Sequence, residues 1–160
     1  SCSNLRVLKL QLGGNTIGCL RRFGEGMTRC SKLGTVCLHL FGNMITDDHL
    51  SELGHAVGRC LSLKVFELYV GANQVVGEQL AQFGEQFKAC TKLSRLFLDF
   101  CGNGIALSCI NGLHLALNRL SSRVSWRVIC DGQTRASRSC EDQPAMLLDW
   151  EVGRERENGE

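Results

Sequence analysis

Residues 60–76 read CLSLKVFELYVGANQVV, and this stretch decides the fold. Three apolar residues, Phe66, Leu68 and Val70, stand at every second position, and Asn73 follows three residues later. An apolar residue at every second position is typical of a β-strand that buries one face. The stretch therefore predicts a strand that ends shortly before Asn73.

The same pattern occurs four times along the chain. Each copy begins at a cysteine and reads C-x-x-L-x-x-Φ-x-Φ-x-Φ-x-x-N-x-Φ, where Φ is an apolar residue. Successive cysteines are 28, 30 and 30 residues apart, and so are the asparagines. The marker residues are Cys2, Cys30, Cys60 and Cys90, and Asn15, Asn43, Asn73 and Asn103. A fixed period of this length predicts stacked units, because one unit cannot bury its apolar face alone.

The second half of each copy changes to a helical period. Leu50, Leu53, Gly54 and Val57 have the i, i+3, i+4, i+7 spacing of an amphipathic helix, and the neighbouring copies repeat it. One interior helix position carries a glycine in three copies, as Gly24, Gly54 and Gly84. Glycine inside a helix costs about 1 kcal/mol relative to alanine. We therefore expect a neighbouring helix or the sheet to approach closely at this position.

Strands and helices in such units cannot stack at the same spacing. Neighbouring parallel strands lie about 4.8 Å apart, whereas packed helices need about 10 Å. This mismatch predicts a curved stack with the strands on its concave side and the helices on its convex side. Each repeated asparagine falls where the chain leaves its strand and the backbone loses its partners. We expect a structural asparagine ladder there, formed by Asn15, Asn43, Asn73 and Asn103.

The repeat resembles that of leucine-rich repeat proteins, and its period with a full helix is similar to the ribonuclease-inhibitor type. Two extra residues separate the strand from the asparagine in all four copies, which predicts a strand one alternation longer than in the family pattern. The resemblance implies an α/β fold, a right-handed leucine-rich-repeat solenoid with a curved parallel sheet inside and helices outside. It also implies protein recognition within a larger intracellular sensor or scaffold, as in ribonuclease inhibitor and NOD-like receptors.

The repeats end before the chain does. We assign residues 1–120 to four leucine-rich repeats and residues 121–133 to a degenerate C-terminal capping repeat. A thirty-residue step from the fourth strand reaches another alternating apolar set, Trp126, Val128 and Cys130. Residues 134–160 lack the pattern and are expected to form a polar, weakly ordered tail. Within this tail, Pro144 to Trp150 either fold back over the last strand or are an unrelated sequence end.

The composition argues against several classes of function. The formal net charge is +2 and the basic residues do not cluster on the strands, which argues against nucleic acid as a partner. No apolar run approaches the roughly 18–20 residues that cross a bilayer, so we expect no membrane partner. The sequence contains no Cys-x-x-Cys pair, no phosphate-binding loop and no G-x-S-x-G elbow. We therefore predict a protein that is not an enzyme and that needs no metal and no cofactor.

Cysteine usage indicates the compartment. Ten cysteines in 160 residues are fewer than in disulfide scaffolds, and no Asn-x-Ser/Thr glycosylation acceptor occurs. These features favour a reducing compartment, and we expect a cytoplasmic protein. We expect either a monomer or a part of a longer chain. The absence of an initial Met favours the second of these.

The strand residues between the buried ones face the concave side and form the candidate site. They combine aromatic, arginine and charged side chains, which are typical of protein interfaces. We predict that a protein partner of unknown identity binds to this concave face through Lys9, Gln11, His39, Glu67, Tyr69, Arg95, Phe97 and Asp99. Cys37 shares the face, where it is either a reactive free thiol or an inert one.

Two alternatives to a binding module remain open at this point. One is a regulator of another enzyme, such as a GTPase-activating protein, which would use an exposed arginine such as Arg95. The other is a structural or autoinhibitory spacer with no specific partner. The first predicts faster nucleotide turnover in trans, and the second predicts neither turnover nor specific binding.

Overall fold

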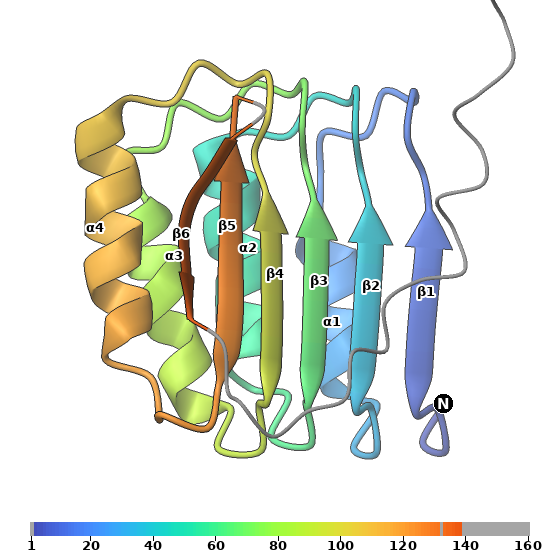
Figure 1. Cartoon of the computed structure of the whole chain (residues 1–160). Coiled ribbons are helices and arrows are strands. Elements are labelled where there is room, and N and C mark those ends of the chain that lie inside the picture. The colour runs from blue at the N-terminus through green and yellow to red at the C-terminus, as the bar shows by residue number, and fades with distance from the viewer. Residues whose placement is uncertain (1, 132, 139–160) are drawn as a thin grey trace, which may run out of the picture.

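The computed structural model describes residues 2–131 and 133–138, which form alternating strands and helices (Figure 1). The strands are β1 (Val7–Gln11), β2 (Thr35–His39), β3 (Val65–Tyr69), β4 (Arg95–Asp99), β5 (Ser125–Cys130) and β6 (Gln133–Arg138). The helices are α1 (Arg21–Thr28), α2 (Asp47–Val57), α3 (Leu80–Gln86), the short 3-10 helix η1 (Phe87–Ala89) and α4 (Leu107–Asn118). The protein is thus an α/β chain in which each of the first four strands is followed by a helix.

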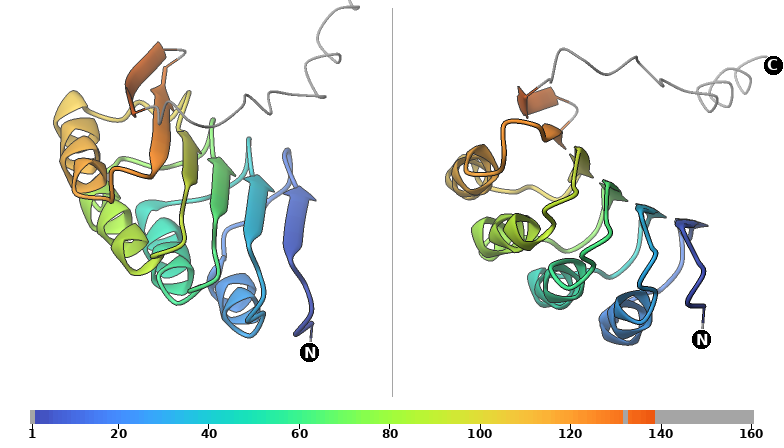
Figure 2. Two further views of the ribbon diagram at one scale, coloured as in Figure 1. Left: turned by 60° about the horizontal axis from the view of Figure 1, so that its bottom comes forward. Right: turned by 90° about the horizontal axis from the view of Figure 1, so that it is seen from below.

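All six strands belong to one sheet, in the order β1-β2-β3-β4-β5-β6. The first five strands are parallel, and β6 pairs antiparallel with β5. Figure 2 shows the strands as the inner row and the helices as the outer row of a curved stack. Consecutive strand–helix units therefore lie side by side, and the sheet face away from the helices remains open.

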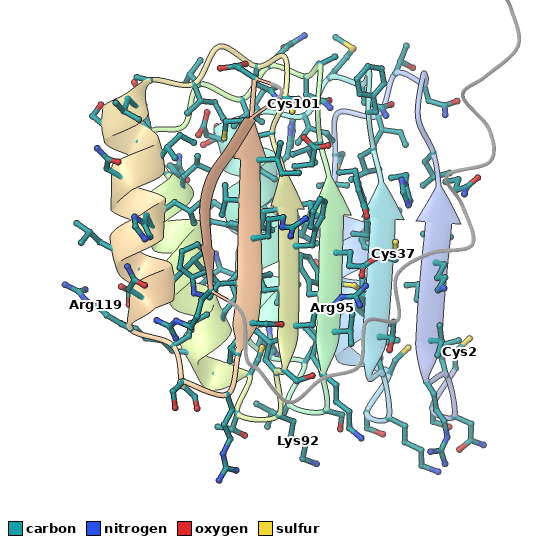
Figure 3. The ribbon with its side chains drawn as sticks, viewed as in Figure 1. Cys2, Cys37, Lys92, Arg95, Cys101 and Arg119 are labelled. Atoms are coloured by element: carbon teal, nitrogen blue, oxygen red, sulfur yellow. The ribbon has the colours of Figure 1, made fainter. Side chains whose placement is uncertain are left out.

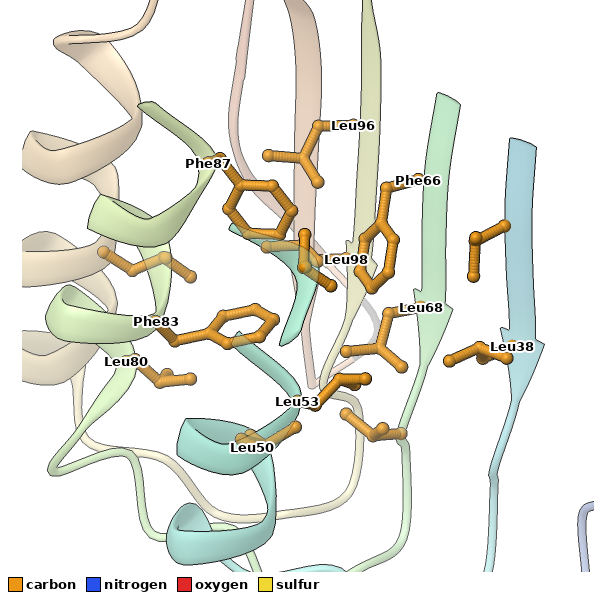
Figure 4. Close-up of a cluster of buried hydrophobic side chains, with 14 of the residues drawn as sticks. Leu38, Leu50, Leu53, Phe66, Leu68, Leu80, Phe83, Phe87, Leu96 and Leu98 are labelled. Carbon is orange, nitrogen blue, oxygen red and sulfur yellow. The ribbon is translucent and has the colours of Figure 1, made fainter. Parts of the chain in front are cut away.

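The register between strands follows the thirty-residue period. Leu38 of β2 pairs with Leu68 of β3, which pairs with Leu98 of β4. These three leucines are at most 1% exposed. Figure 4 shows them among phenylalanines and leucines from α2 and α3, between the sheet and the helices. The predicted stacking of equivalent residues on adjacent parallel strands is confirmed.

Backbone pairing continues past the ends of the assigned strands. Leu40 N donates to Tyr69 O (2.7 Å), and Gly42 N donates to Gly71 O (3.0 Å). The same two bonds recur one unit later, from Val70 and Ala72. This continued pairing accommodates the two extra residues that separate each strand from its asparagine.

The repeated helix glycines lie where neighbouring helices approach each other. A Cβ on Gly24 would lie 2.7 Å from the Cβ of Ala56, and one on Gly54 would lie 2.9 Å from a ring carbon of Phe83. On Gly84 it would lie 2.9 Å from Leu113. The expectation of a close approach at this position is confirmed, and the neighbour is the next helix along the chain.

The C-terminal part differs from the prediction in one respect. Strand β5 pairs with β4 as the thirty-residue step predicts, with Trp126 opposite Leu96 and Val128 opposite Leu98. Residues 134–138, however, were assigned to a weakly ordered tail and instead belong to β6. That assignment was wrong because β6 is held by backbone pairing with the edge of β5, which needs no apolar pattern. The rest of the expected tail, residues 139–160, lies outside the described residues.

No helix in the described part of the chain is both long and apolar enough to cross a membrane.

Candidate interaction surface on the concave face

The concave face is the side of the sheet that points away from the helices (Figure 3). Strand pairing aligns its side chains in rows that cross the sheet. One row contains Lys9, Cys37, Glu67 and Phe97, the next contains Gln11, His39, Tyr69 and Asp99, and Arg95 lies in the row of Val7, Thr35 and Val65. All eight residues of the predicted site therefore lie on one face, spread over four adjacent strands.

An aromatic cluster occupies the centre of this face. The rings of His39 and Tyr69 stack with centroids 4.1 Å apart and planes only 7° from parallel. The Tyr69 and Phe97 rings are 4.9 Å apart and tilted by 38°. Each ring is partly exposed. Sequence reasoning placed these residues on one face, and the structure shows that the three rings form a continuous cluster from β2 to β4.

Burial within the cluster affects protonation. Desolvation lowers the pKa of His39, although the nearby Glu67 carboxylate acts in the opposite direction. The imidazole is therefore favoured in its neutral form. Desolvation, together with Glu67, raises the pKa of the Tyr69 hydroxyl, so the phenol remains protonated. The aromatic cluster thus consists of uncharged rings.

Charged groups surround the aromatic cluster. Arg95 forms an ion pair with Glu67 across the β3–β4 pair. The arginine side chain is 44% exposed, so solvent screens the pair and its contribution to stability is small. One oxygen of Asp99 accepts a hydrogen bond from Cys101 N at 2.9 Å. Lys9 and Gln11 are exposed on β1.

Cys37 lies on this face but is not an exposed thiol. It is only 7% exposed, and its Sγ lies 3.4 Å from Nε2 of His39. Burial, together with Glu67, raises the pKa of the Cys37 thiol to about 12. A reactive cysteine needs a lowered pKa, because the thiolate is the nucleophile. The interpretation of Cys37 as a reactive free thiol is therefore wrong.

The Cys37–His39 pair also lacks the electrostatics of a catalytic pair. A thiolate–imidazolium pair would require a lowered cysteine pKa and a raised histidine pKa. Both shifts have the opposite sign here. Among residues 2–131 and 133–138, no group of three or more His, Cys, Asp or Glu side chains is placed to hold a metal ion.

Two further residues of the same rows were missed by the sequence reasoning. Arg127 of β5 pairs with Phe97, and Ile129 pairs with Asp99. Arg127 is exposed, so the concave face extends onto the fifth strand with an additional positive charge. The thirty-residue step from Phe97 and Asp99 was the signal that could have identified both.

The repeated asparagines bridge neighbouring units at the ends of the strands. Asn43 donates from Nδ2 to Leu12 O and Leu40 O, both at 2.9 Å, and its Oδ1 accepts from Ile17 N at 3.0 Å. Asn73 and Asn103 make the equivalent bonds one and two units later. Asn15 differs, because it is exposed and donates to Leu12 O and Gly13 O of its own unit. These amides shape the rim of the sheet rather than the concave face.

Asp47 is a further structural residue that the sequence did not reveal. It is 8% exposed, and its carboxylate accepts hydrogen bonds from Val76 N (2.8 Å) and Gly77 N (2.9 Å) of the next unit. The corresponding position holds Gly77 in the next repeat and Leu107 in the one after, so no repeated pattern marked it.

Compared with known proteins, the chain matches no family model, no curated protein and no solved structure.

Proposed function

We propose that this chain is a leucine-rich repeat module of the ribonuclease-inhibitor type and that it binds a protein partner on its concave face. The observation that carries the proposal is the aromatic cluster of His39, Tyr69 and Phe97 on the open face of the sheet. Aromatic side chains held on a rigid surface lose little conformational entropy on binding, and they dominate the energetics of many protein interfaces.

The surrounding charges support a protein rather than a nucleic acid as partner. The concave face carries positive charge on Lys9, Arg95 and Arg127 and negative charge on Glu67 and Asp99. Mixed signs around an apolar centre are typical of protein interfaces, where the charges orient the partner. A nucleic-acid surface would need clustered positive charge.

The same module belongs in a reducing compartment such as the cytoplasm, as a non-enzymatic part of a larger sensor or scaffold. The cysteines at the starts of the third and fourth repeats, Cys60 and Cys90, are buried free thiols. Buried free cysteines act as small apolar residues, which supports a structural role for them.

Affinity capture with matched variants tests the proposal. The full chain is used to capture partners from cell extract, in parallel with Tyr69→Ala, Phe97→Ala and the convex-side control Leu115→Ala. Leu115 lies on α4 and is 63% exposed. We expect a partner that the wild type and the control retain and that both concave variants bind with about 5- to 150-fold lower affinity, equivalent to about 1–3 kcal/mol. Equal capture by all four proteins would contradict the proposal.

The two other functions give different results in the same experiment. A GTPase regulator would accelerate GTP hydrolysis by the captured protein and lose this effect in Arg95→Ala. A spacer would capture no partner that distinguishes the concave variants from the control.

A further inference from the structure

Charged residues are unevenly divided between the two edges of the sheet at which its strands begin and end. The loops that lead into the five parallel strands, residues 2–6, 29–34, 58–64, 87–94 and 119–124, contain nine basic residues and no acidic one. The loops that follow the first four strands, residues 12–20, 40–46, 70–79 and 100–106, contain one acidic residue, Glu78, and no basic one. Because these strands are parallel, the loops that lead into them share one edge, the lower one in Figure 1.

Helix dipoles account for four of the nine basic residues. These four lie within two residues of the ends of α1, α2, α3 and α4, where a helix dipole stabilises positive charge, and they are Arg29, Arg59, Lys88 and Arg119. Lys88 and Arg119 also form ion pairs with Glu85. The other five basic residues lie nearer to the strands, beyond the last helical turn, and form what we call the basic edge: Arg6, Lys32, Lys64, Lys92 and Arg123.

Backbone hydrogen bonds hold the loops of the basic edge side by side. Gly34 N donates to Arg6 O and Lys64 N donates to Gly34 O, both at 2.8 Å. The series continues from Ser94 N to Lys64 O (2.8 Å) and from Ser125 N to Ser94 O (2.9 Å). All five side chains of the basic edge are exposed, and none forms an ion pair with another described residue. A row of like charges of this kind attracts an anionic occupant.

The chain itself contains an anionic segment. Residues 139–160 contain seven acidic and two basic residues, whereas the described residues are basic overall. The acidic residues are spread along the segment, as Glu141, Asp142, Asp149, Glu151, Glu155, Glu157 and Glu160. Its charge therefore complements that of the basic edge.

The segment begins at the basic edge. Strand β6 runs antiparallel to β5, so it ends where the parallel strands begin. Its last residue, Arg138, donates hydrogen bonds to Asn118 O (2.8 Å) and Leu120 O (3.1 Å), at the start of the loop that contains Arg123. Four strand spacings of about 4.8 Å separate β5 from β1, about 19 Å in all. Eleven residues lead from Arg138 to Asp149, and an extended chain of that length spans up to roughly 36 Å. The segment is therefore long enough to follow the whole basic edge.

From the charges, the starting point and this reach, we infer that the acidic C-terminal segment of the same chain, residues 139–160, binds along the basic edge. Its carboxylates lie against the exposed arginine and lysine side chains of the edge. A tethered segment acts at a high effective concentration, in the millimolar range for a short linker. The segment therefore competes with external polyanions, such as nucleic acid, for the basic edge. This contact lies outside the concave face and does not depend on the partner proposed there.

Zero-length cross-linking of the full chain with a carbodiimide tests this contact, because the reagent joins a carboxylate to an amine only where the two touch. The chain has five lysines: Lys32, Lys64 and Lys92 on the basic edge, Lys9 on the concave face, and Lys88 beside Glu85. We expect cross-links from the acidic residues within 149–160 to Lys32 and Lys64, in at least 5-fold higher yield than to the exposed Lys9, measured by peptide mass spectrometry. Equal yields at Lys9 would overturn the inference.

Two matched variants test whether charge holds the segment. Arg6→Gln/Arg123→Gln removes two charges from the basic edge but retains its lysines, and it should lower the cross-link yield at Lys32 and Lys64 by at least 3-fold. The control Arg21→Gln/Arg22→Gln removes the same charge at exposed positions in the first turn of α1, outside the basic edge, and should leave the yield unchanged. An unchanged yield in the first variant, or an equal loss in both, would overturn the inference.

Isotope labelling identifies the source of the segment. When ¹⁴N-labelled and ¹⁵N-labelled chains are mixed before cross-linking, a segment from the same chain gives cross-linked peptides that carry a single isotope. Peptide pairs of mixed isotope would assign the contact to a second copy and overturn the inference. An absence of cross-links from residues 149–160 to Lys32 and Lys64 would overturn it as well, and would leave the basic edge to an external polyanion.

Discussion

Asn73 makes several hydrogen bonds with a single amide. Its Nδ2 donates to Leu40 O (2.9 Å) and Val70 O (3.0 Å), and its Oδ1 accepts from Ile45 N (2.9 Å). Alanine would leave Ile45 N without this partner in a partly buried setting. It would also remove one of the two amide donors that Leu40 O and Val70 O each accept from. We expect Asn73→Ala to lower the free energy of unfolding by about 2–3 kcal/mol, measured by urea denaturation.

Asn15 supplies the matched control for this prediction. It occupies the same repeat position, but it is exposed and bonds within its own unit. Asn15→Ala should lower the free energy of unfolding by less than about 1 kcal/mol, because water can replace the lost bonds. Equal losses in the two variants would show that bridging between units does not account for the role of Asn73.

The buried thiols predict a pH dependence of stability. Burial, supplemented by nearby groups, raises the pKa of Cys37 to about 12 and those of Cys60 and Cys90 to about 11, from an ordinary value of 9.0. Above pH 9 these thiols ionise in the unfolded chain but remain protonated in the folded one. The unfolded state is then favoured, so the free energy of unfolding should fall between pH 9 and 11.

Urea denaturation at a series of pH values measures this slope. Cys60→Ala should make the decline between pH 9 and 11 shallower, whatever its effect on stability at pH 7. Cys2→Ser, at an exposed cysteine, should leave the slope unchanged. A free energy of unfolding that stays constant from pH 8 to pH 11 would contradict the prediction.

Repetition determined which individual residues could be predicted. The structural role of Asn43, Asn73 and Asn103 followed from their period, since a polar residue that recurs at one position serves the repeat itself. Asp47 makes comparable bonds to the next unit but occurs in one repeat, so nothing in the sequence separated it from a surface carboxylate. The burial of Cys37 was missed because strand alternation gives the face of a side chain and not the cover that its neighbours provide.

At the scale of the helices, two glycines of α1 predict changes of opposite sign. A Cβ on Gly24 would lie 2.7 Å from the Cβ of Ala56 on α2, whereas a Cβ on Gly26 would meet no atom within 4 Å. Gly24→Ala should destabilise the protein by about 1–2 kcal/mol, because the overlap outweighs the gain in helix propensity. Gly26→Ala should stabilise it by about 0.5–1 kcal/mol.

Thermal unfolding of the two alanine variants measures this difference directly. Since both substitutions are identical in chemistry and lie in one helix, only the packing against α2 separates them. Stabilisation by both variants would mean that α1 and α2 are further apart than the structure shows.

Strand β6 shows where prediction of elements from sequence failed. Strands β1 to β5 were found from apolar residues at every second position, whereas residues 133–138, QTRASR, carry one apolar residue. The available signal was the turn before the strand. Cys130 pairs with Gln133, and the two residues between them, Asp131 and Gly132, form a pair that favours tight hairpin turns. Asp131 has a positive φ of 49°, as such a turn requires.

At the scale of the whole molecule, Arg138 closes one end of the stack. Its guanidinium binds the carbonyl oxygens of Asn118 and Leu120 and lies 5.9 Å from the centre of the Trp126 ring. We expect Arg138→Ala to lower the free energy of unfolding by about 1–2 kcal/mol. Hydrogen exchange should speed up first in β5 and α4, because units in a stack depend mainly on their neighbours.

Arg138→Lys is the corresponding control. Lysine retains the charge but cannot reproduce several directed bonds from one planar group, so it should recover less than half of the lost stability. Uniform acceleration of exchange from β1 to β5 in Arg138→Ala would indicate that the stack unfolds only as one unit.

The amide bridges from Asn43, Asn73 and Asn103 have a consequence for how such a chain can change in length. Each bridge joins two units by the same atoms in the same register. Tandem duplication of one thirty-residue segment would insert a unit that fits both of its neighbours, without redesign of either junction. An insertion of one residue within a strand would break the bridges and reverse which side chains are buried, and one of two residues would still move the asparagine out of register with its partners, so whole repeats are the increments in which this architecture can grow.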